Sequence, residues 1–211
     1  MFESRQDAAQ LLTVKLLKTV EDKDIAVLAL ARGAVPMGRM IADYLSCPFD
    51  TIVCKKIGAP LNIEFAIGAV APKNTIYWNE NVLKKIGLSK NTLRKLKLEK
   101  EEERKKLEKK LRSGKTSIEI KNKTIVLIDD GVATGATVMA ALLSLKKQKA
   151  NKIILAVPVI AKDTFKDLRK FFDKIITLKK TNNFYAVGQF YRNFKQVTDE
   201  EVIKILESNI S

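Results

Sequence analysis

The stretch IVLIDDGVATGATVMAAL, residues 125–142, decides the fold of this 211-residue chain. An apolar run ends at two aspartates, Asp129 and Asp130, and is followed by a loop of small residues and then by a second apolar run. This order is typical of a fully buried parallel strand, a loop and a helix. Ligands of open parallel sheets bind beyond the carboxyl ends of the strands, so the loop lies where a binding site is expected.

The loop has the composition of an anion-binding turn. Gly131 and Gly135 permit unusual backbone angles, and main-chain amides at the start of a helix can donate to a phosphate. The predicted phosphate-binding residues are Ala133, Thr134, Gly135, Ala136 and Thr137. The loop has neither the lysine of a nucleoside-triphosphate loop nor the GxGxxG pattern of a dinucleotide fold. Adjacent carboxylates can accept both hydroxyls of a vicinal diol, so a ribose 5-phosphate would satisfy the loop and the acids together.

The segments on either side of this stretch alternate between strand and helix patterns. Such alternation predicts an α/β fold with a doubly wound, mainly parallel sheet and right-handed crossovers. The expected strands are residues 25–30, 51–54, 124–129, 153–159 and 174–178, and the expected helices are residues 7–19, 135–149 and 163–172. Residues 67–70 and 75–78 are expected to add short extended pieces.

The net charge of +15 is concentrated in one segment. Residues 84–123 hold 16 basic and 6 acidic residues, which gives 16 − 6 = +10. Within this segment, residues 89–112 form a predicted helix that begins at a serine cap and ends before Gly114. Its leucines lie near its two ends and its middle is polar all round, so we expect it to project from the core. We expect one domain over residues 1–211, with a basic helical insertion at 80–114 and a C-terminal hood or tail at 180–211.

The composition excludes several kinds of site. The chain contains no histidine, which excludes Ser-His-Asp and Cys-His triads and an imidazole base. Its two cysteines, Cys47 and Cys54, form no CxxC pair, so neither a zinc site nor a disulfide framework is expected. The first residues lack the apolar stretch of a signal peptide, and no run is long enough to span a membrane. We therefore expect a cytoplasmic protein without a membrane partner.

The segment VLIDDGVATGAT resembles the motif with which type I phosphoribosyltransferases bind phosphoribosyl pyrophosphate (PRPP). The resemblance implies that Asp129 and Asp130 hold the ribose 2- and 3-hydroxyls and that the turn at 133–137 holds the 5-phosphate. The segment LARGAVPMG, residues 30–38, resembles the family's pyrophosphate loop. It implies that Arg32 and Gly33 bind pyrophosphate and that Gly33 needs an unusual peptide geometry. Two further segments, residues 54–72 and 184–202, resemble a bacterial branch of predicted phosphoribosyltransferases, so the resemblance covers nearly the whole chain.

The resemblance also suggests the remaining parts of the site. Lys55 or Lys56, at the end of the second strand, is expected at the pyrophosphate, and Glu64 is expected to act as a base or to contact a metal-bound water. The candidate catalytic residues are Arg32, Lys56 and Glu64. The ring of Tyr185 or Tyr191 is expected to line the acceptor pocket, because the family builds its small hood subdomain partly from terminal segments. A lid is expected at residues 61–66 or around the basic helix.

The implied reaction is transfer of the phosphoribosyl group to a nitrogenous acceptor with release of pyrophosphate. It passes through an oxocarbenium-like state that needs no covalent nucleophile. Magnesium is the implied cofactor, held mainly by PRPP and water. Hypoxanthine and guanine enzymes of the family carry an aspartate where this chain has Ala133, so the loop is more similar to that of the adenine enzyme. The identity of the acceptor stays open.

Two other hypotheses concern the basic helix. The alternative function is a PRPP- or nucleotide-sensing regulator that binds nucleic acid on the same fold, and the excess of lysine and arginine favours it. A homodimer is also expected, and the terminal leucines of the helix would allow it to act as a dimer arm.

Overall fold

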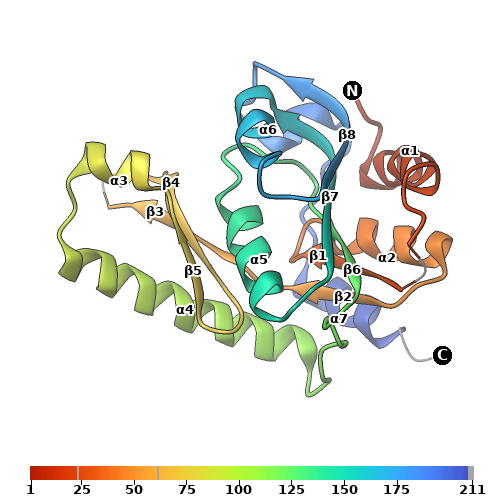
Figure 1. Ribbon diagram of the computed structural model, residues 1–211, viewed down its shortest axis with the longest axis horizontal. Helices are drawn as coiled ribbons and strands as arrows, with labels where there is room; N and C mark the ends of the chain where they lie inside the picture. Colours follow the sequence, from red (N-terminus) through yellow and green to blue (C-terminus); the bar gives the residue numbers. More distant parts are fainter. Residues whose placement is uncertain (23, 61, 209–211) are drawn as a thin grey trace.

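A computed structural model describes residues 1–22, 24–60 and 62–208 of the chain. Its centre is a five-stranded sheet in the order β2-β1-β6-β7-β8 (Figure 1). The strands are β1 (Ile25–Leu30), β2 (Phe49–Ile52), β6 (Thr124–Ile128), β7 (Lys152–Ala161) and β8 (Lys174–Thr181). Every pairing in this sheet is parallel, which confirms the predicted fold class.

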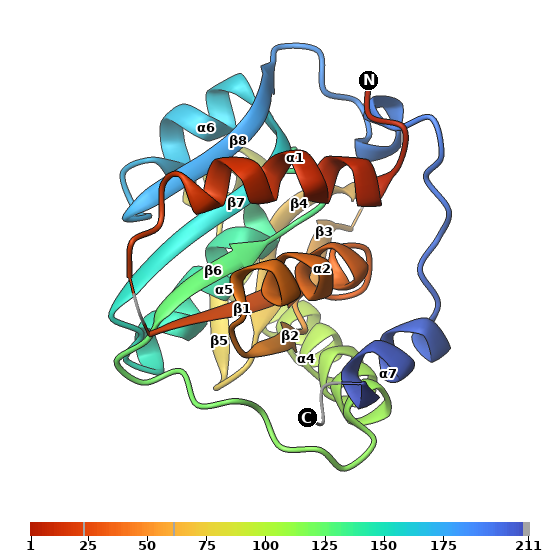
Figure 2. The ribbon, with the colours of Figure 1, turned by 90° about the vertical axis from the view of Figure 1, so that its right-hand side faces the viewer.

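Helices cover both faces of the sheet because successive strand residues point to opposite sides. Val27 and Ala29 of β1 pack in one apolar cluster with α1 (Arg5–Leu17) and α2 (Val35–Leu45). Leu28 and Leu30 pack on the other side with α5 (Ala136–Lys147) and α6 (Lys162–Leu168). Figure 2 shows α1 and α2 together in front of the sheet. The continuous apolar run of β1 is thus explained by burial on both faces.

The order of the strands brings two loops together. The chain leaves β1 through α2 toward β2 on one side, and it leaves β6 through α5 toward β7 and β8 on the other. The winding therefore reverses between β1 and β6, and the carboxyl ends of these neighbouring strands open into a crevice. The loops at 31–34 and 129–135 meet at this point.

A second sheet forms where the sequence predicted only short extended pieces. It contains β3 (Lys55–Ala59), β4 (Asn62–Ala71) and β5 (Thr75–Trp78) in an antiparallel order β3-β4-β5. Alternate residues after Gly68 again divide between two faces: Ala69 and Ala71 pack in the cluster that contains α5, whereas Val70 packs in a cluster with Leu93 and Leu96. This sheet, α3 (Glu80–Ile86) and α4 (Lys90–Arg112) make a small unit beside the main sheet (Figure 1).

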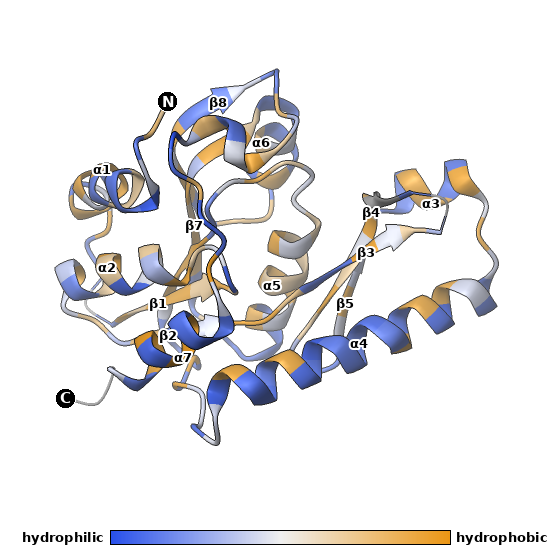
Figure 3. Ribbon diagram, turned by 180° about the vertical axis from the view of Figure 1, so that it is seen from behind, coloured by the Kyte–Doolittle hydropathy of each residue, from blue (hydrophilic) through white to orange (hydrophobic). Residues whose placement is uncertain are grey.

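The basic helix extends beyond the main sheet, as expected (Figure 1), but the expectation that its polar middle is exposed on every side is wrong. Figure 3 shows α4 as a largely hydrophilic helix that runs beside β3, β4 and β5. In its polar middle, Arg104 has a side chain only 4% exposed, paired with Glu101 and Glu108. Its end is fixed by Arg112, which donates to both carboxylate oxygens of Asp50 at 3.1 Å. The expectation failed because it treated every charged residue of the helix as exposed.

The proposed dimer arm is also not supported by the packing of α4. Leu93 and Leu96 pack against the small sheet, and Leu107 and Leu111 pack in the main core cluster. These leucines are used within the chain, so they are not available to a second copy. In the part of the chain that the structure describes, no helix is long and apolar enough to cross a membrane.

Candidate active site

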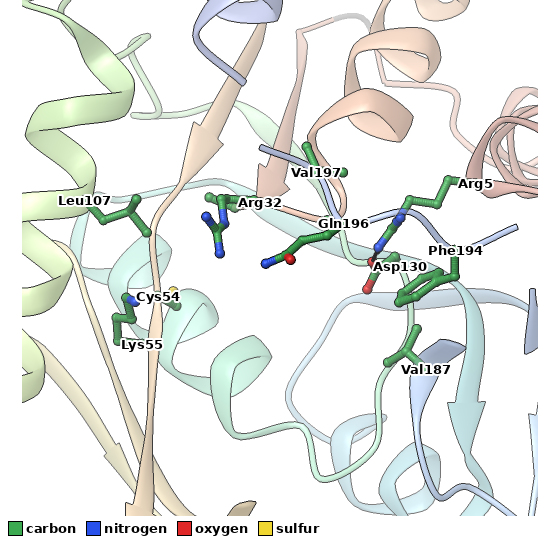
Figure 4. Close-up of a pocket in the computed structure, with 12 residues that line it drawn as sticks. Arg5, Arg32, Cys54, Lys55, Leu107, Asp130, Val187, Phe194, Gln196 and Val197 are labelled. Carbon is green, nitrogen blue, oxygen red and sulfur yellow. Dashed lines mark hydrogen bonds and ion pairs between the residues drawn. The ribbon is translucent and has the colours of Figure 1, made fainter. Parts of the chain in front are cut away.

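A cavity of about 420 Å³ opens at the carboxyl ends of β1 and β6. Three cationic side chains line it, Arg5, Arg32 and Lys55, together with the carboxylate of Asp130. Figure 4 shows Arg32 and Gln196 between Lys55 on one side and the Arg5–Asp130 pair on the other. The walls come from distant parts of the sequence, because residues 187–197 close the side opposite α4. A cavity with these charges suits a strongly anionic ligand.

The two aspartates follow β6 directly, as predicted, but their surroundings differ. The Asp130 side chain is 12% exposed, and its Oδ2 accepts a hydrogen bond from Arg5 Nε at 2.9 Å and pairs with Arg5 Nη2 at 2.8 Å. Asp129 has no cationic partner among the described residues, and its Oδ1 accepts the Asp130 amide at 2.9 Å. Burial raises the pKa of both carboxyls; the charge of Asp130 raises that of Asp129 further, whereas Arg5 opposes the rise at both.

The predicted phosphate loop forms the turn into α5. Gly135 is the residue before the helix and has a φ of +74°, in the region that favours glycine. A Cβ there would also lie 3.1 Å from Thr164 and 3.2 Å from Leu168. Thr164 fixes the preceding turn by donating to the Ala133 carbonyl. No side chain caps the helix start, so the first amides of α5 are open to an anion.

The loop after β1 lies against the acidic pair. A Cβ on Gly33 would stand 2.2 Å from Asp130 Oδ2, so only glycine permits this approach. The expected unusual peptide geometry lies one bond earlier, since the Ala31–Arg32 peptide is cis. Arg32 donates through Nη1 to Asp199 Oδ1 at 3.0 Å, and Lys110 donates to the other oxygen of Asp199 at 2.7 Å. Asp199 is the first residue of α7 (Asp199–Glu207), so this helix holds the predicted pyrophosphate residue.

The two candidate lysines have different positions. Lys55 lines the cavity, and its Nζ lies 3.8 Å from Glu103 of α4. Lys56 follows it in β3 and points to the opposite face of the strand, and it is not among the cavity-lining residues. Leu61 and the side chain of Glu64 lie outside the described residues, so the structure does not place the candidate base or the first residue of the expected lid at 61–66.

The candidate tyrosines lie outside the cavity. Tyr191 is 5% exposed, its hydroxyl donates to the Asp130 carbonyl at 2.6 Å, and its ring packs against Phe2 and Phe194. It supports the acidic pair from behind and does not present its ring to a ligand. Tyr185 is 87% exposed and does not line the cavity.

Residues that the sequence did not single out complete the wall. Phe194 lines the cavity, with the Arg5 guanidinium 3.7 Å from its ring centre and Tyr191 stacked at 5.0 Å. Gln196 also lines it. Phe194 and Gln196 lie in the segment 184–202 that resembles the family, but no local pattern identified Arg5, whose partner is 125 positions away.

The sequence is similar to known proteins over nearly its whole length. A family described as the phosphoribosyl transferase domain matches residues 3–195. Two proteins of Mycobacterium tuberculosis, MT0597 and Rv0571c, both named as candidate phosphoribosyl transferases, are each 32% identical over 207 residues. These residues are 98% of this chain and 46% of each relative, so the chain spans about half the length of the curated relatives it matches.

Solved structures share the fold. The protein TT1426 from Thermus thermophilus is 30% identical with a TM-score of 0.83, and the match covers 98% of both chains. A purine phosphoribosyltransferase from Pyrococcus horikoshii is 15% identical with a TM-score of 0.51, covering 92% of this chain and 91% of that one. The second comparison concerns the fold alone.

Proposed function

The chain belongs to the phosphoribosyl transferase domain family, and from this premise we propose that it transfers the phosphoribosyl group of PRPP to a nitrogenous acceptor and releases pyrophosphate. The observation that carries the proposal is a single arrangement at the carboxyl ends of β1 and β6. Asp130 and the cationic loop after β1 line one cavity there, and Asp129 and the uncapped start of α5 lie beside Asp130 along the chain. A diol, a monophosphate and a pyrophosphate on one ribose match these three parts.

The ribose and its phosphate are assigned to the loop after β6. Asp129 and Asp130 accept the 2- and 3-hydroxyls, and the amides of residues 133–137 donate to the 5-phosphate. Thr134 is exposed and Thr137 is half-buried, so their hydroxyls can add donors at the mouth of the turn. The backbone position of Gly135 keeps this turn close to α6.

The pyrophosphate is assigned to Arg32, Gly33 and Lys55. Both side chains are held by carboxylates in this structure, Arg32 by Asp199 and Lys55 by Glu103. Both pairs are partly exposed and therefore weak, so a pyrophosphate with several negative charges can replace the carboxylates. Lys56 lies outside the cavity, and we assign the catalytic cation to Lys55 in its place.

Catalysis in this proposal is electrostatic. Cations at the leaving pyrophosphate stabilise the charge that develops as the glycosidic bond breaks, and the grip on the ribose fixes the acceptor's line of approach. The thiol of Cys54 lines the cavity, but burial raises its pKa, so the thiol stays neutral. A dissociative displacement without a covalent intermediate agrees with this site.

Magnesium is the proposed cofactor. In the described part of the chain, no group of three or more histidine, cysteine, aspartate or glutamate side chains could hold a metal ion. We propose that its ligands are mainly PRPP oxygens and water, which is the usual preference of Mg²⁺ at phosphates. Bound there, the ion would neutralise part of the pyrophosphate charge.

The decisive experiment is titration calorimetry of PRPP with and without Mg²⁺, on the wild type and on Asp129→Asn. Asp129 is the cleaner target because it has no cationic partner among the described residues, whereas a change at Asp130 would leave the half-enclosed Arg5 unpaired. We expect Mg²⁺-dependent binding by the wild type and at least about a tenfold weaker affinity in the variant, since one charge-assisted hydrogen bond contributes about 1.5–3 kcal/mol.

Lys56→Gln is the matched control, because it removes a charge close to the cavity without touching its wall. Release of pyrophosphate with a panel of purines, pyrimidines and simple amines would then identify the acceptor. A folded wild-type protein that does not bind PRPP would overturn the proposed function.

The alternative regulator has one observation in its favour. The exposed side of α4 carries more cations than anions, namely Arg94, Lys95, Lys105, Lys106 and Lys109 against Glu99 and Glu102. If this side binds RNA, the affinity for a single-stranded oligonucleotide should fall steeply with salt and should fall further in Lys105→Gln/Lys106→Gln/Lys109→Gln. Equal oligonucleotide binding by the wild type and the variant would contradict the regulator and leave the transferase as the remaining proposal.

The expected homodimer also remains a proposal. The exposed apolar side chains of α1, Leu11, Val14 and Leu17, are the surface to test, because each is about half exposed or more. A Leu11→Lys/Val14→Lys variant that sediments as a smaller species than the wild type would support it.

A further inference from the structure

Arg5 connects three parts of the molecule at the acidic pair. It is the first residue of α1, and its side chain is 12% exposed. Its Nε and Nη2 reach Asp130 Oδ2, its Nη1 donates to the Lys195 carbonyl at 2.7 Å, and its guanidinium lies 3.7 Å from the Phe194 ring centre (Figure 4). Each of the three guanidinium nitrogens therefore lies against an oxygen atom, and the guanidinium also stacks on the Phe194 ring.

This contact leaves room for a ligand. Arg5 uses one oxygen of Asp130, and the Asp130 amide uses one oxygen of Asp129. Within the described residues, no hydrogen bond reaches Asp130 Oδ1 or Asp129 Oδ2. A vicinal diol has two hydroxyl donors and needs one acceptor from each carboxylate. Arg5 can therefore remain in place while a ribose binds.

The charges around Asp130 make Arg5 its main counter-ion. Asp129 adds a second negative charge beside it, and the Tyr191 hydroxyl is kept neutral because burial raises its pKa. Arg32 and Lys55 line the same cavity but are paired with Asp199 and Glu103. The Lys195 carbonyl binds Arg5 itself. Two adjacent carboxylates in a half-enclosed site repel each other and favour protonation unless a cation is close.

We propose that Arg5 is a positioning residue of the ribose site, which fixes Asp130 in its charged form while leaving one free oxygen on each aspartate for the diol. This inference rests on the proposed binding of PRPP. Arg5 acts through Asp130 and does not need to touch the substrate.

The test combines three variants and two measurements. Arg5→Gln removes the cation, and Arg5→Lys keeps the charge but not the planar contact with Asp130 and Phe194. Arg192→Gln is the matched control, because Arg192 pairs at 2.9 Å with Glu3 and joins the same two terminal segments away from the cavity. The carboxyl pKa of Asp130 is followed by NMR in the free protein, and the PRPP affinity is measured by calorimetry between pH 5 and 9.

In Arg5→Gln, we expect the curve of PRPP affinity against pH to shift to higher pH. PRPP binding needs both carboxylates charged, so the affinity rises with pH until the acids are ionised. Loss of a neighbouring cation should raise the pKa of Asp130 by about one pH unit or more. At a pH below that pKa, the affinity should fall about tenfold for each pH unit by which the pKa of Asp130 has risen. Arg5→Lys should show a smaller rise in this pKa, and Arg192→Gln should show none.

Either measurement can overturn the inference. An unchanged Asp130 pKa in Arg5→Gln, or a uniform loss of affinity at every pH, would show that Arg5 only supports the fold. A wild-type protein that does not bind PRPP would instead overturn the proposed function, and the ribose role of Arg5 with it, whatever the pKa measurement gives.

Discussion

Asp129 and Asp130 show how two identical neighbours can have different roles. Asp130 is held by Arg5 and lies against Gly33, whereas Asp129 forms no ion pair among the described residues. A half-buried carboxylate without an ion-pair partner costs folding free energy, and such costs are usual where a protein prepares a ligand site. The sequence predicted both acids, but not this difference, because Arg5 reaches Asp130 only through the tertiary fold.

The first prediction is that Asp129→Asn stabilises the free protein at neutral pH. Burial and Asp130 raise the folded pKa of Asp129 above the ordinary value, so folding binds a proton that the unfolded chain releases. The free energy of unfolding of the wild type therefore falls as the pH rises from about 4 to the folded pKa of Asp129. Above that pKa, the full cost of holding the charged carboxyl in the folded protein is present. The amide removes this cost, and we expect a gain of at least about 1 kcal/mol at pH 7, or about 2–4 °C in Tm.

Thermal melts at pH 4 and pH 7 check this prediction. The gain should be much smaller at pH 4, where the folded carboxyl of the wild type is protonated and about half of the unfolded carboxyl is. A loss of stability at pH 7 would mean that Asp129 makes a favourable contact in its charged form.

The second prediction concerns the pair between Arg32 and Asp199. If the proposed pyrophosphate must displace Asp199, then Asp199→Asn removes a competitor and should raise the PRPP affinity. The Arg32 side chain is 38% exposed, so the pair contributes at most about 1 kcal/mol, which corresponds to an increase of about fivefold or less. Calorimetry at constant salt measures it, with Glu200→Gln as control because Glu200 is 71% exposed and its ion-pair partner is Lys110, at 3.9 Å, and not Arg32. A weaker affinity in Asp199→Asn would show that Asp199 orients Arg32 for the ligand.

At the scale of elements, α4 is the helix whose structure differs most from the prediction made from its sequence. Its polar middle contains a buried ion network in which Arg104 donates to Glu101 and Glu108 at distances from 2.7 to 3.0 Å. All three side chains belong to α4, so the network neutralises the enclosed side of the helix, while Leu93 and Leu96 pack against the small sheet and Leu107 lines the cavity. The helix thereby links the small sheet to the site.

The third prediction tests this network. Arg104→Leu leaves two half-enclosed carboxylates without their cation, and we expect a loss of about 3 kcal/mol, or roughly 6–12 °C in Tm. Lys106→Leu makes the same change on the exposed side of α4 and should have little effect. Denaturant titration measures both. Recovery of most of the stability in Glu101→Gln/Arg104→Leu/Glu108→Gln would confirm that the uncompensated charge is the cause, whereas no recovery would point to lost packing.

The accuracy of the sequence predictions follows the range of the interactions. The parallel strands and the loop at 129–135 were predicted because apolar runs and small residues carry their signal locally. The small sheet was missed in part because Ala66, Ala69 and Ala71 have low strand propensity and gain their place by packing against α5. The position of α4 and the contact of Arg5 depend on partners far along the chain, which no local pattern reveals.

At the scale of the whole molecule, the two terminal segments meet beside the site. The Phe2 amide donates to the Phe190 carbonyl at 2.8 Å, and the Arg192 and Asn193 amides donate to the Phe2 and Glu3 carbonyls at 2.9 Å. Figure 2 shows the segment before α7 running beside α1 and α2. Arg5 and Tyr191 extend this junction to Asp130, so the acidic pair is joined to both segments. Terminal segments therefore line one side of the cavity, and Leu107 of α4 lines the other (Figure 4).

The last prediction follows from this junction. If PRPP binds the acidic pair, it should stabilise the groups that hold Asp130, and hydrogen exchange should slow together in residues 2–5, 129–137 and 190–196. The turn at residues 121–123 is the internal control, because it precedes β6 and therefore lies at the amino ends of the parallel strands, opposite the cavity. Exchange measured by mass spectrometry with and without PRPP checks the prediction, and Arg5→Gln should uncouple residues 2–5 from the others. Protection confined to residues 129–137 in the wild type would mean that PRPP stabilises the phosphate turn alone. The terminal segments would then line the cavity without being coupled to the ligand.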